Sequence, residues 1–216
     1  MNQTVARYQR VLAGVSDVVS RIPGDRWTAP SPCTEWTTLH VLGHLVDGQD
    51  QIATLITGQG PREPLKDPLA AAGGDPASTW AATTRHVDSL LAAADPAAVV
   101  PSHHGDVTVE AVLGTAVIEP LIHAWDLAQA AELAVSLDEE AVATCLAVIA
   151  PMAEQFAATG MYAPARAARM NAPLSSGFSL FSVAVRAESL AKGPGEGRPA
   201  RWLESTRPLA GRRDGL

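Results

Sequence analysis

The chain has 216 residues and a formal net charge of −7; 47% of its residues are hydrophobic and 18% are charged. A chain of this length and composition forms one globular domain, or one domain with an appendage, and buries a sizeable core. Only 5% of the residues are aromatic, whereas Ala, Leu and Val dominate. Because Ala and Leu are strong helix formers, the composition favours a helical fold.

Membrane and secretory segments are not predicted. No uninterrupted apolar run reaches the roughly 18 residues of a membrane-spanning helix, and the first residues lack the basic and apolar pattern of a signal peptide. Cys33 and Cys145 are too few for a disulfide framework. We therefore expect a reduced, cytoplasmic protein that does not engage a membrane.

Charge divides the chain into two parts. Residues 1–160 hold 7 Lys and Arg against 19 Asp and Glu, a net charge of −12, and residues 161–216 hold 9 against 4, a net charge of +5. The acidic part argues against nucleic acid as the main partner. We predict a helical domain over 1–160 and an atypical basic segment over 161–216. From Lys192 this segment is rich in Gly, Pro and Arg, so we expect it to be partly disordered.

Apolar residues recur at helical spacing in five stretches. Thr37 is a candidate N-cap, Ser136-Leu-Asp-Glu139 has the spacing of a capping box, and Pro120 is expected to kink the fourth helix. Residues 58–76, with four prolines and four glycines, are expected to be loop, and residues 99–107 are either a short β segment or loop. The predicted helices cover 4–21, 37–57, 77–94, 108–133 and 136–159.

Short connections between amphipathic helices are typical of an up-down bundle. We therefore predict an all-α fold, an up-down four-helix bundle built from the first four helices. The fifth helix is an addition to this bundle, and an irregular C-terminal tail follows it.

The segment that carries the most chemical information is Glu119-Pro-Leu-Ile-His123-Ala-Trp125-Asp126-Leu127. Glu119 and His123 are four residues apart, so a helix places them on one face. On a helical wheel His123 lies inside the apolar sector, and Glu119 and Asp126 lie at its margin. A carboxylate and an imidazole that face a bundle interior need a partner, because an unpaired buried charge is costly. A divalent metal ion is one such partner.

The second predicted helix offers a third ligand. His40 and His44 are four residues apart, with Asp47 three residues further on. His44 lies at the edge of the apolar sector, whereas His40 lies farther out among polar residues, so His44 is the better inward ligand. Asp47 and Asp126 are candidates for hydrogen bonds that orient the imidazoles.

Each of these residues also has a simpler interpretation. A Glu-x-x-x-His pair is common on helix surfaces, and a core histidine often only satisfies a polar neighbour. His103 and His104 are adjacent in an expected loop, where histidines are usually exposed. An inert thiol is the simpler interpretation for Cys33, which has no evident basic neighbour. Spacing alone therefore leaves a metal site and a polar core pair both open.

Two motifs resemble those of a known family. The first is Pro32-Cys33-Thr34-Glu35-Trp36-Thr37 followed by His40-Val-Leu-Gly-His44-Leu45, and the second is Glu119-x-x-x-His123-Ala-Trp125-Asp126-Leu127-Ala128. Both are similar to signatures of the mycothiol-dependent maleylpyruvate isomerase / DinB-like superfamily, in its branch of small actinobacterial metal-binding proteins. The resemblance covers roughly residues 5–160.

The resemblance implies a four-helix bundle that holds a divalent metal ion. Carried over position by position, the ligands are His44, Glu119 and His123, the same three that the helical wheels favour. Histidine and carboxylate ligands suit zinc, although nickel, manganese or iron would also be held. The resemblance further implies mycothiol as the candidate thiol cofactor.

The resemblance ends near Gly160. The isomerase itself has a separate C-terminal domain that contributes to its activity, and residues 161–216 do not resemble that domain. We therefore do not expect maleylpyruvate isomerase activity in the strict sense. The basic tail also differs from the acidic, apolar ending of the smaller members, and we hypothesise that it arises from a changed reading frame.

Three functions follow as alternatives. The first is an enzyme that transfers a small thiol to, or isomerises, a small electrophilic substrate; the thiol supplies the nucleophile, so no nucleophilic side chain is required. The second is a metal- or ligand-binding bundle without catalysis. The third is a structural module, such as a homodimerisation domain, in which Glu119 and His123 only pair with each other.

Overall fold

The computed structural model describes residues 2–33, 35–103 and 105–149. Two short antiparallel strands, β1 (Val99–Ser102) and β2 (Gly105–Thr108), form a hairpin. The end of the predicted fifth helix, with Pro151, and the basic tail lie outside the described residues. The helices are α1 (Gln3–Arg21), α2 (Thr38–Ile56), α3 (Pro76–Ala93), α4 (Val109–Ala116), α5 (Ile118–Ala130) and α6 (Glu139–Ile149), with 3₁₀ turns η1 (Gly24–Arg26) and η2 (Pro68–Ala72).

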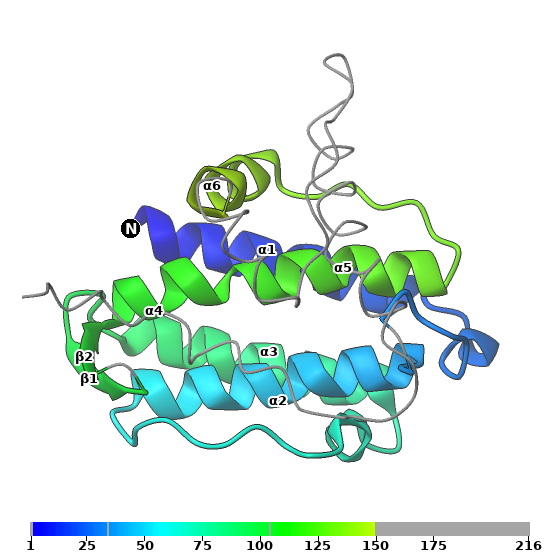
Figure 1. Cartoon of the computed structure of the whole chain (residues 1–216), viewed down its shortest axis with the longest axis horizontal. Helices are drawn as coiled ribbons and strands as arrows, with labels where there is room; N and C mark the ends of the chain where they lie inside the picture. The colour runs from blue at the N-terminus through cyan, green and yellow to red at the C-terminus, as the bar shows by residue number, and fades with distance from the viewer. Residues whose placement is uncertain (1, 34, 104, 150–216) are drawn as a thin grey trace, which may run out of the picture.

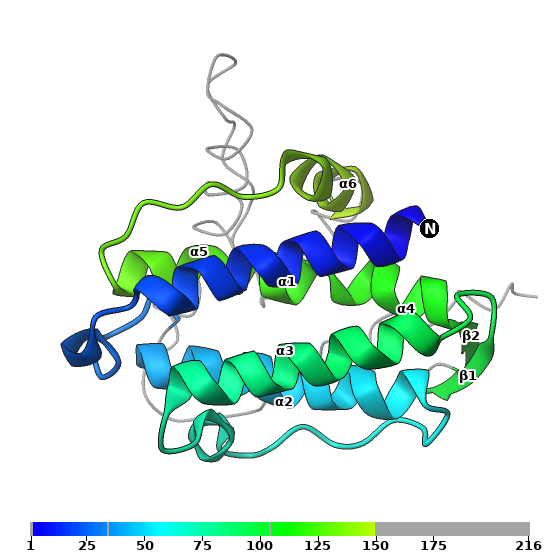
Figure 2. The same ribbon diagram turned by 180° about the vertical axis from the view of Figure 1, so that it is seen from behind.

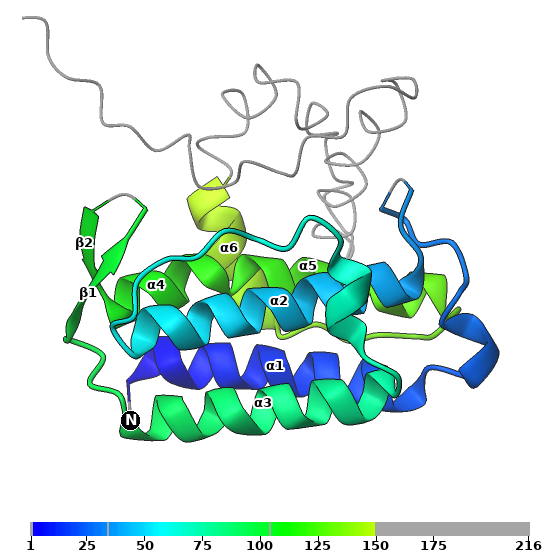
Figure 3. The ribbon, with the colours of Figure 1, turned by 90° about the horizontal axis from the view of Figure 1, so that it is seen from below.

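Four helical rods make the bundle: α1, α2, α3 and the nearly continuous pair α4–α5 (Figure 1). Each rod packs against two neighbours, in the order α1, α3, α2, α5 around the bundle (Figures 1 and 2). α6 runs across the outside of α1 and α5, and the hairpin lies at one end (Figure 3). The predicted all-α four-helix bundle with an additional helix is confirmed.

The connection between α2 and α3 sets the directions of the helices. Residues 57–75 return along the outside of α2, so α3 starts at the same end of the bundle as α2 (Figures 1 and 3). α2 and α3 therefore run in the same direction, opposite to α1 and α4–α5, so the order is up-down-down-up rather than the alternating up-down order predicted from the sequence. The loop predicted over 58–76 contains the ordered turn η2, which packs on α2.

The core is mainly aliphatic, with two rings whose polar atoms are satisfied. Trp80 of α3 is 1% exposed and donates its indole N–H to Ser16 Oγ of α1 at 2.9 Å. Tyr8 of α1 donates its hydroxyl to Gln49 Oε1 of α2 at 2.9 Å. Such bonds remove the cost of burying polar atoms and fix the helices relative to one another. α1 contributes a buried stripe at three- and four-residue spacing: Val5, Tyr8, Val11, Leu12, Val15, Val18 and Val19.

One helical run among the described residues, Val109–Ala130, is long and apolar enough for a membrane span, with a mean hydropathy of 1.2. Of its most apolar window, 61% is buried inside the bundle. This run consists of α4 and α5, which pack on α1 and α2. The apolar character of Val109–Ala130 is therefore explained by its burial in the core of the bundle.

Pro120 divides the helix that the sequence predicts over 108–133. Val117, between α4 and α5, keeps helical dihedral angles of φ −60° and ψ −21°. Proline has no N–H to donate to the carbonyl of Ala116, four residues earlier, and its ring crowds that carbonyl. The helix is interrupted at Val117, two residues before Glu119 and close to the position at which the sequence predicts a kink.

The two predicted N-caps have different outcomes. Thr37 caps α2, and its N–H donates to His40 Nδ1 at 3.2 Å, as in a capping box. The capping box predicted at Ser136 is wrong. Asp138 caps α6 instead: its Oδ1 accepts the N–H of Ala141 at 2.8 Å, and Arg10 of α1 holds its other oxygen at 2.7 Å.

Asp47 fastens the 57–75 connection to α2. This carboxylate is 2% exposed, and its Oδ2 accepts the backbone N–H of Leu65 at 3.1 Å and the side-chain amide of Gln51 at 3.0 Å. Its Oδ1 pairs with the guanidinium of Arg62. These contacts hold residues 57–75 against the outer side of α2.

Gly43 lets η2 approach α2. A Cβ at position 43 would overlap the carbonyl oxygen of Pro68, whereas a Cβ at Gly48, on the same helix, would have no atom within 4 Å. Alanine substitutions at the two positions therefore distinguish the effect of close packing, which acts only at Gly43, from the effect of helix propensity, which acts at both.

We expect Gly43→Ala to destabilise the fold by roughly 1–3 kcal/mol, because the new methyl group forces η2 away from α2. Gly48→Ala is the matched control, and its better helix propensity should raise stability by up to about 1 kcal/mol. Urea unfolding measures both variants. Equal stabilities would show that η2 does not rest on α2.

Candidate metal centre

His44 of α2 and Glu119 and His123 of α5 converge across the α2–α5 interface. His44 Nε2 lies 3.0 Å, and His123 Nε2 lies 3.2 Å, from the same oxygen, Glu119 Oε2. The two imidazole rings meet edge to face, with centroids 5.0 Å apart. One donor atom from each of the three residues lies within 4.8 Å of the others. The structure thus brings together the three residues that the sequence analysis selects.

Helix geometry explains the convergence. Glu119 and His123 are four residues apart on α5, so both project from one face, and α5 packs against α2. The side chains of Glu119 and His44 are 32% and 29% exposed, whereas that of His123 is 12% exposed. The cluster is therefore most buried at His123 and partly exposed to solvent at His44 and Glu119.

Asp126 determines which nitrogen of His123 faces the cluster. Its Oδ2 lies 2.8 Å from His123 Nδ1, and an ionised carboxylate only accepts, so Nδ1 carries a hydrogen. Nε2 then faces the carboxylate of Glu119. Two acceptors attract each other only when a proton or a cation lies between them. The contact between His123 Nε2 and Glu119 Oε2 therefore requires a proton or a cation between the two atoms.

A proton on His123 is one such partner. Burial alone would lower the pKa of His123, but contacts with Cys33 and the Glu119 carboxylate outweigh burial and raise the pKa to about 9. Burial would likewise raise the pKa of Glu119, yet the hydrogen bonds from His123 and His44 hold that pKa below its ordinary value. A carboxylate and an imidazolium therefore share this site at neutral pH.

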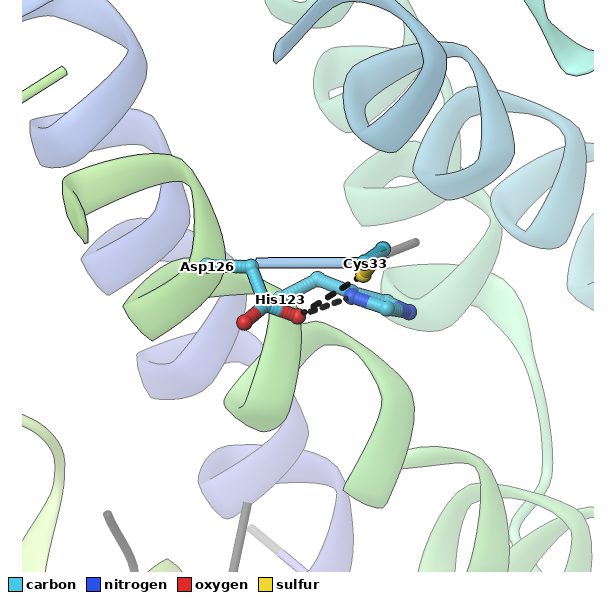
Figure 4. Close-up of side chains that lie close together, drawn as sticks. All are labelled: Cys33, His123 and Asp126. Atoms are coloured by element: carbon cyan, nitrogen blue, oxygen red, sulfur yellow. Dashed lines mark hydrogen bonds and ion pairs between the residues drawn. The ribbon is translucent and has the colours of Figure 1, made fainter. Parts of the chain in front are cut away.

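The loop before α2 covers the cluster. The Trp36 indole lies at a tilt against the His44 ring, with centroids 5.2 Å apart, and 6.5 Å from the centroid of His123. On the other side, Cys33 Sγ lies 3.4 Å from Asp126 Oδ2 (Figure 4). Sequence reasoning favours an inert thiol for Cys33 and assigns no role in the site to Trp36. Their place in the segment that directly precedes His40 and His44 is the signal that could have identified them.

Backbone hydrogen bonds fix this loop to the first turn of α2. The N–H groups of Thr38 and Leu39 donate to the carbonyls of Ala29 and Trp27, each at 3.0 Å. Glu35 adopts a left-handed φ of 67°, which turns the chain between Cys33 and Trp36. The cover is therefore positioned by the same helix that carries His44.

The other residues that the sequence analysis singles out have different roles in the structure. Asp126 contacts His123 as predicted. The prediction that Asp47 orients an imidazole is wrong, because Asp47 is taken up by Arg62 and the 57–75 connection. His40 caps the start of α2, and His103 is exposed in the hairpin turn. Among the described residues, neither histidine joins a group of three metal-ligating side chains.

The sequence model of a protein family, described as the mycothiol maleylpyruvate isomerase N-terminal domain, matches residues 8–128. The chain belongs to this family. The matched range includes His44, Glu119, His123 and Asp126. It ends before α6, so the family domain corresponds to the four-helix bundle.

Two Mycobacterium tuberculosis proteins, named Uncharacterized protein Rv0738 and Uncharacterized protein MT0763, are each 29% identical to this chain over 154 residues. The alignments cover 71% of this chain and 81% of each relative. The bundle also resembles crystal structures of mycothiol-dependent maleylpyruvate isomerase, with TM-scores of 0.51 for that enzyme and 0.54 for a histidine-to-alanine mutant. Both are 15% identical; the matches cover 73% and 71% of this chain and 71% of each solved chain. At this identity the likeness shows the fold.

The raised pKa of His123 has a stability consequence in metal-free protein. A group whose folded pKa lies above its unfolded value stabilises the fold below the unfolded pKa and loses this contribution as pH rises through the folded pKa. We therefore expect the stability difference between wild type and Glu119→Gln to be full between about pH 4.5 and 6.5, to decline as pH rises through about 9, and to decline in acid as Glu119 becomes protonated.

Urea unfolding after chelator treatment, repeated across this pH range, measures that difference, and NMR titration of His123 measures its pKa. A pKa near 6.5 in both proteins, or a stability difference that does not change with pH, would contradict the pairing.

Proposed function

We propose that the bundle binds a divalent cation, zinc, through His44, Glu119 and His123. We further propose that it acts with a small thiol such as mycothiol to transfer or isomerise a small electrophilic substrate. The observation that carries the proposal is the convergence of two imidazole Nε2 atoms on one carboxylate oxygen, at 3.0 and 3.2 Å.

The spacing of the donors suits a tetrahedral zinc ion. Ligand atoms about 2.0–2.1 Å from zinc lie roughly 3.3 Å from one another. The distances from Glu119 Oε2 to the two Nε2 atoms differ from this value by a few tenths of an ångström. Small side-chain rotations are therefore enough for an ion to replace the shared proton, and three protein ligands leave positions open for other molecules.

A bound zinc ion would supply Lewis acidity and favour the ionised form of a coordinated thiol. The protein residues prepare the site for it. Asp126 keeps the hydrogen of His123 on Nδ1 and directs the Nε2 lone pair to the ion. Trp36 shields one side of His44, and the half-exposed edges of His44 and Glu119 admit the thiol and the substrate.

The thiol part of the proposal draws on the relatives. The family description and the solved structures name mycothiol and maleylpyruvate isomerase for those proteins. A reduced cytoplasmic compartment, in which small thiols stay unoxidised, suits this function. A metal- or ligand-binding bundle without catalysis fits the same cluster and is the second candidate, because the three side chains complete a metal site without any substrate group.

Metal content tests the binding step. Purified wild type is expected to hold about one zinc ion per chain, and His44→Ala to lose affinity by orders of magnitude, because two ligands do not complete the site. His103→Ala is the matched control, since this exposed histidine lies in the hairpin turn. Elemental analysis after dialysis, with circular dichroism to verify the fold, gives the readout. Full zinc retention by folded His44→Ala would refute the ligand set.

Thiol consumption separates the enzyme from the binding module. Zinc-loaded protein is expected to accelerate the loss of mycothiol in the presence of small electrophiles, or the thiol-dependent isomerisation of a small unsaturated keto acid. Chelator-treated protein and Glu119→Gln should fall to the uncatalysed rate. Zinc binding without any acceleration would favour the non-catalytic bundle.

A further inference from the structure

The far side of the His123 ring faces a second group of metal-ligating atoms. Asp126 Oδ2 lies 2.8 Å from His123 Nδ1 and 3.4 Å from Cys33 Sγ. Figure 4 shows the three side chains gathered where the loop before α2 meets α5. One donor atom from each lies within 4.8 Å of the other two. We propose that this group is a second cation site, selective for thiophilic ions such as Cd²⁺ or Cu⁺, which competes with the zinc site for His123.

The donor set supports the choice of ion. Cys33 offers sulfur, His123 nitrogen and Asp126 oxygen, whereas the zinc site offers two nitrogens and one oxygen. Thiolate sulfur is the ligand that soft cations prefer. With the bond lengths of zinc, a tetrahedral ion would hold sulfur roughly 3.5 Å from its other donors, close to the 3.4 Å between Cys33 Sγ and Asp126 Oδ2. The larger Cd²⁺ ion needs a wider spacing, which a small movement of the loop that carries Cys33 would supply.

The burial of the three side chains indicates an enclosed site that an ion can reach from one side. Asp126 is 0% exposed and His123 is 12% exposed. Cys33 is half-buried on the loop, so an ion reaches the group from the loop side. Hydrogen bonds between Ser31 and Cys33 hold the loop in a turn at this point, at 3.1 and 3.2 Å.

Competition follows from the chemistry of one imidazole. A cation on Nδ1 displaces the hydrogen that His123 shares with Asp126, and the thiol proton of Cys33 leaves to solvent. The neutral ring then carries its one hydrogen on Nε2, which donates to Glu119 Oε2 across the observed 3.2 Å. With Nε2 protonated, His123 no longer ligates zinc, so each chain holds one ion at one of the two sites.

Cadmium titration of chelator-treated protein tests the site, because a cadmium–thiolate bond gives an ultraviolet charge-transfer band. We expect the band to saturate at one Cd²⁺ per chain and to be absent from Cys33→Ser. Cys145→Ser is the matched control, and it should retain the band. Cys145 is buried in α6, and burial raises its pKa to about 11, outweighing the opposing effect of Arg7.

Two further arms separate this proposal from the zinc proposal. Glu119→Gln should lose zinc but keep the cadmium band, because its amide oxygen still accepts the Nε2 hydrogen. Wild type given both metals should hold one ion in total. A band that survives in Cys33→Ser, a band that is lost in Cys145→Ser, or two ions per chain would overturn the proposal. Failure of wild type to retain zinc would refute only the first site.

Discussion

Glu119 Oε2 lies between the Nε2 atoms of two histidines, and this contact joins the two helices that form the site. α2 carries His44 and α5 carries Glu119 and His123. The contact between His123 and Glu119 is attractive only with a proton or a cation between the facing atoms, because Asp126 keeps the other hydrogen of His123 on Nδ1. A proton on His123 satisfies this requirement, and the divalent cation that we propose would bind all three donors at once.

The surrounding structure keeps this arrangement in place from three directions. Pro120 ends α4 and starts a new helix directly before Glu119. Gly43 and Asp47 hold the 57–75 connection on the outer face of α2, which leaves the inner face to His44. The loop before α2 brings Trp36 over the imidazoles. Sites built on helices and supported in this way hold their geometry more closely than sites built on loops.

The sequence predicts those parts of the molecule that depend on helical periodicity. The bounds of α1, α2 and α3 agree within one residue, and His44, Glu119 and His123 fall on facing helix sides because a 3.6-residue period determines which side chains point inward. The role of Asp126 follows for the same reason, since it lies three residues from His123 on one helix.

Parts that depend on aperiodic segments could not be predicted. Asp47 faces Arg62 because of the path of the Pro- and Gly-rich connection over 57–75. This connection has no periodic apolar pattern from which its path could be predicted. The same connection makes α3 parallel to α2. Cys33 reaches Asp126 because backbone bonds and the left-handed Glu35 fold the loop back, and α6 is capped by Asp138 because Arg10 of a distant helix binds it. These outcomes depend on tertiary contacts, not on local pattern.

The most direct test of the account is the set of atoms around zinc in the loaded protein without added thiol. X-ray absorption at the zinc edge should show nitrogen and oxygen neighbours at about 2.0–2.1 Å, with the scattering pattern of two imidazole rings and no sulfur. A sulfur neighbour at about 2.3 Å, or a single imidazole, would place zinc away from His44, Glu119 and His123 and contradict the account.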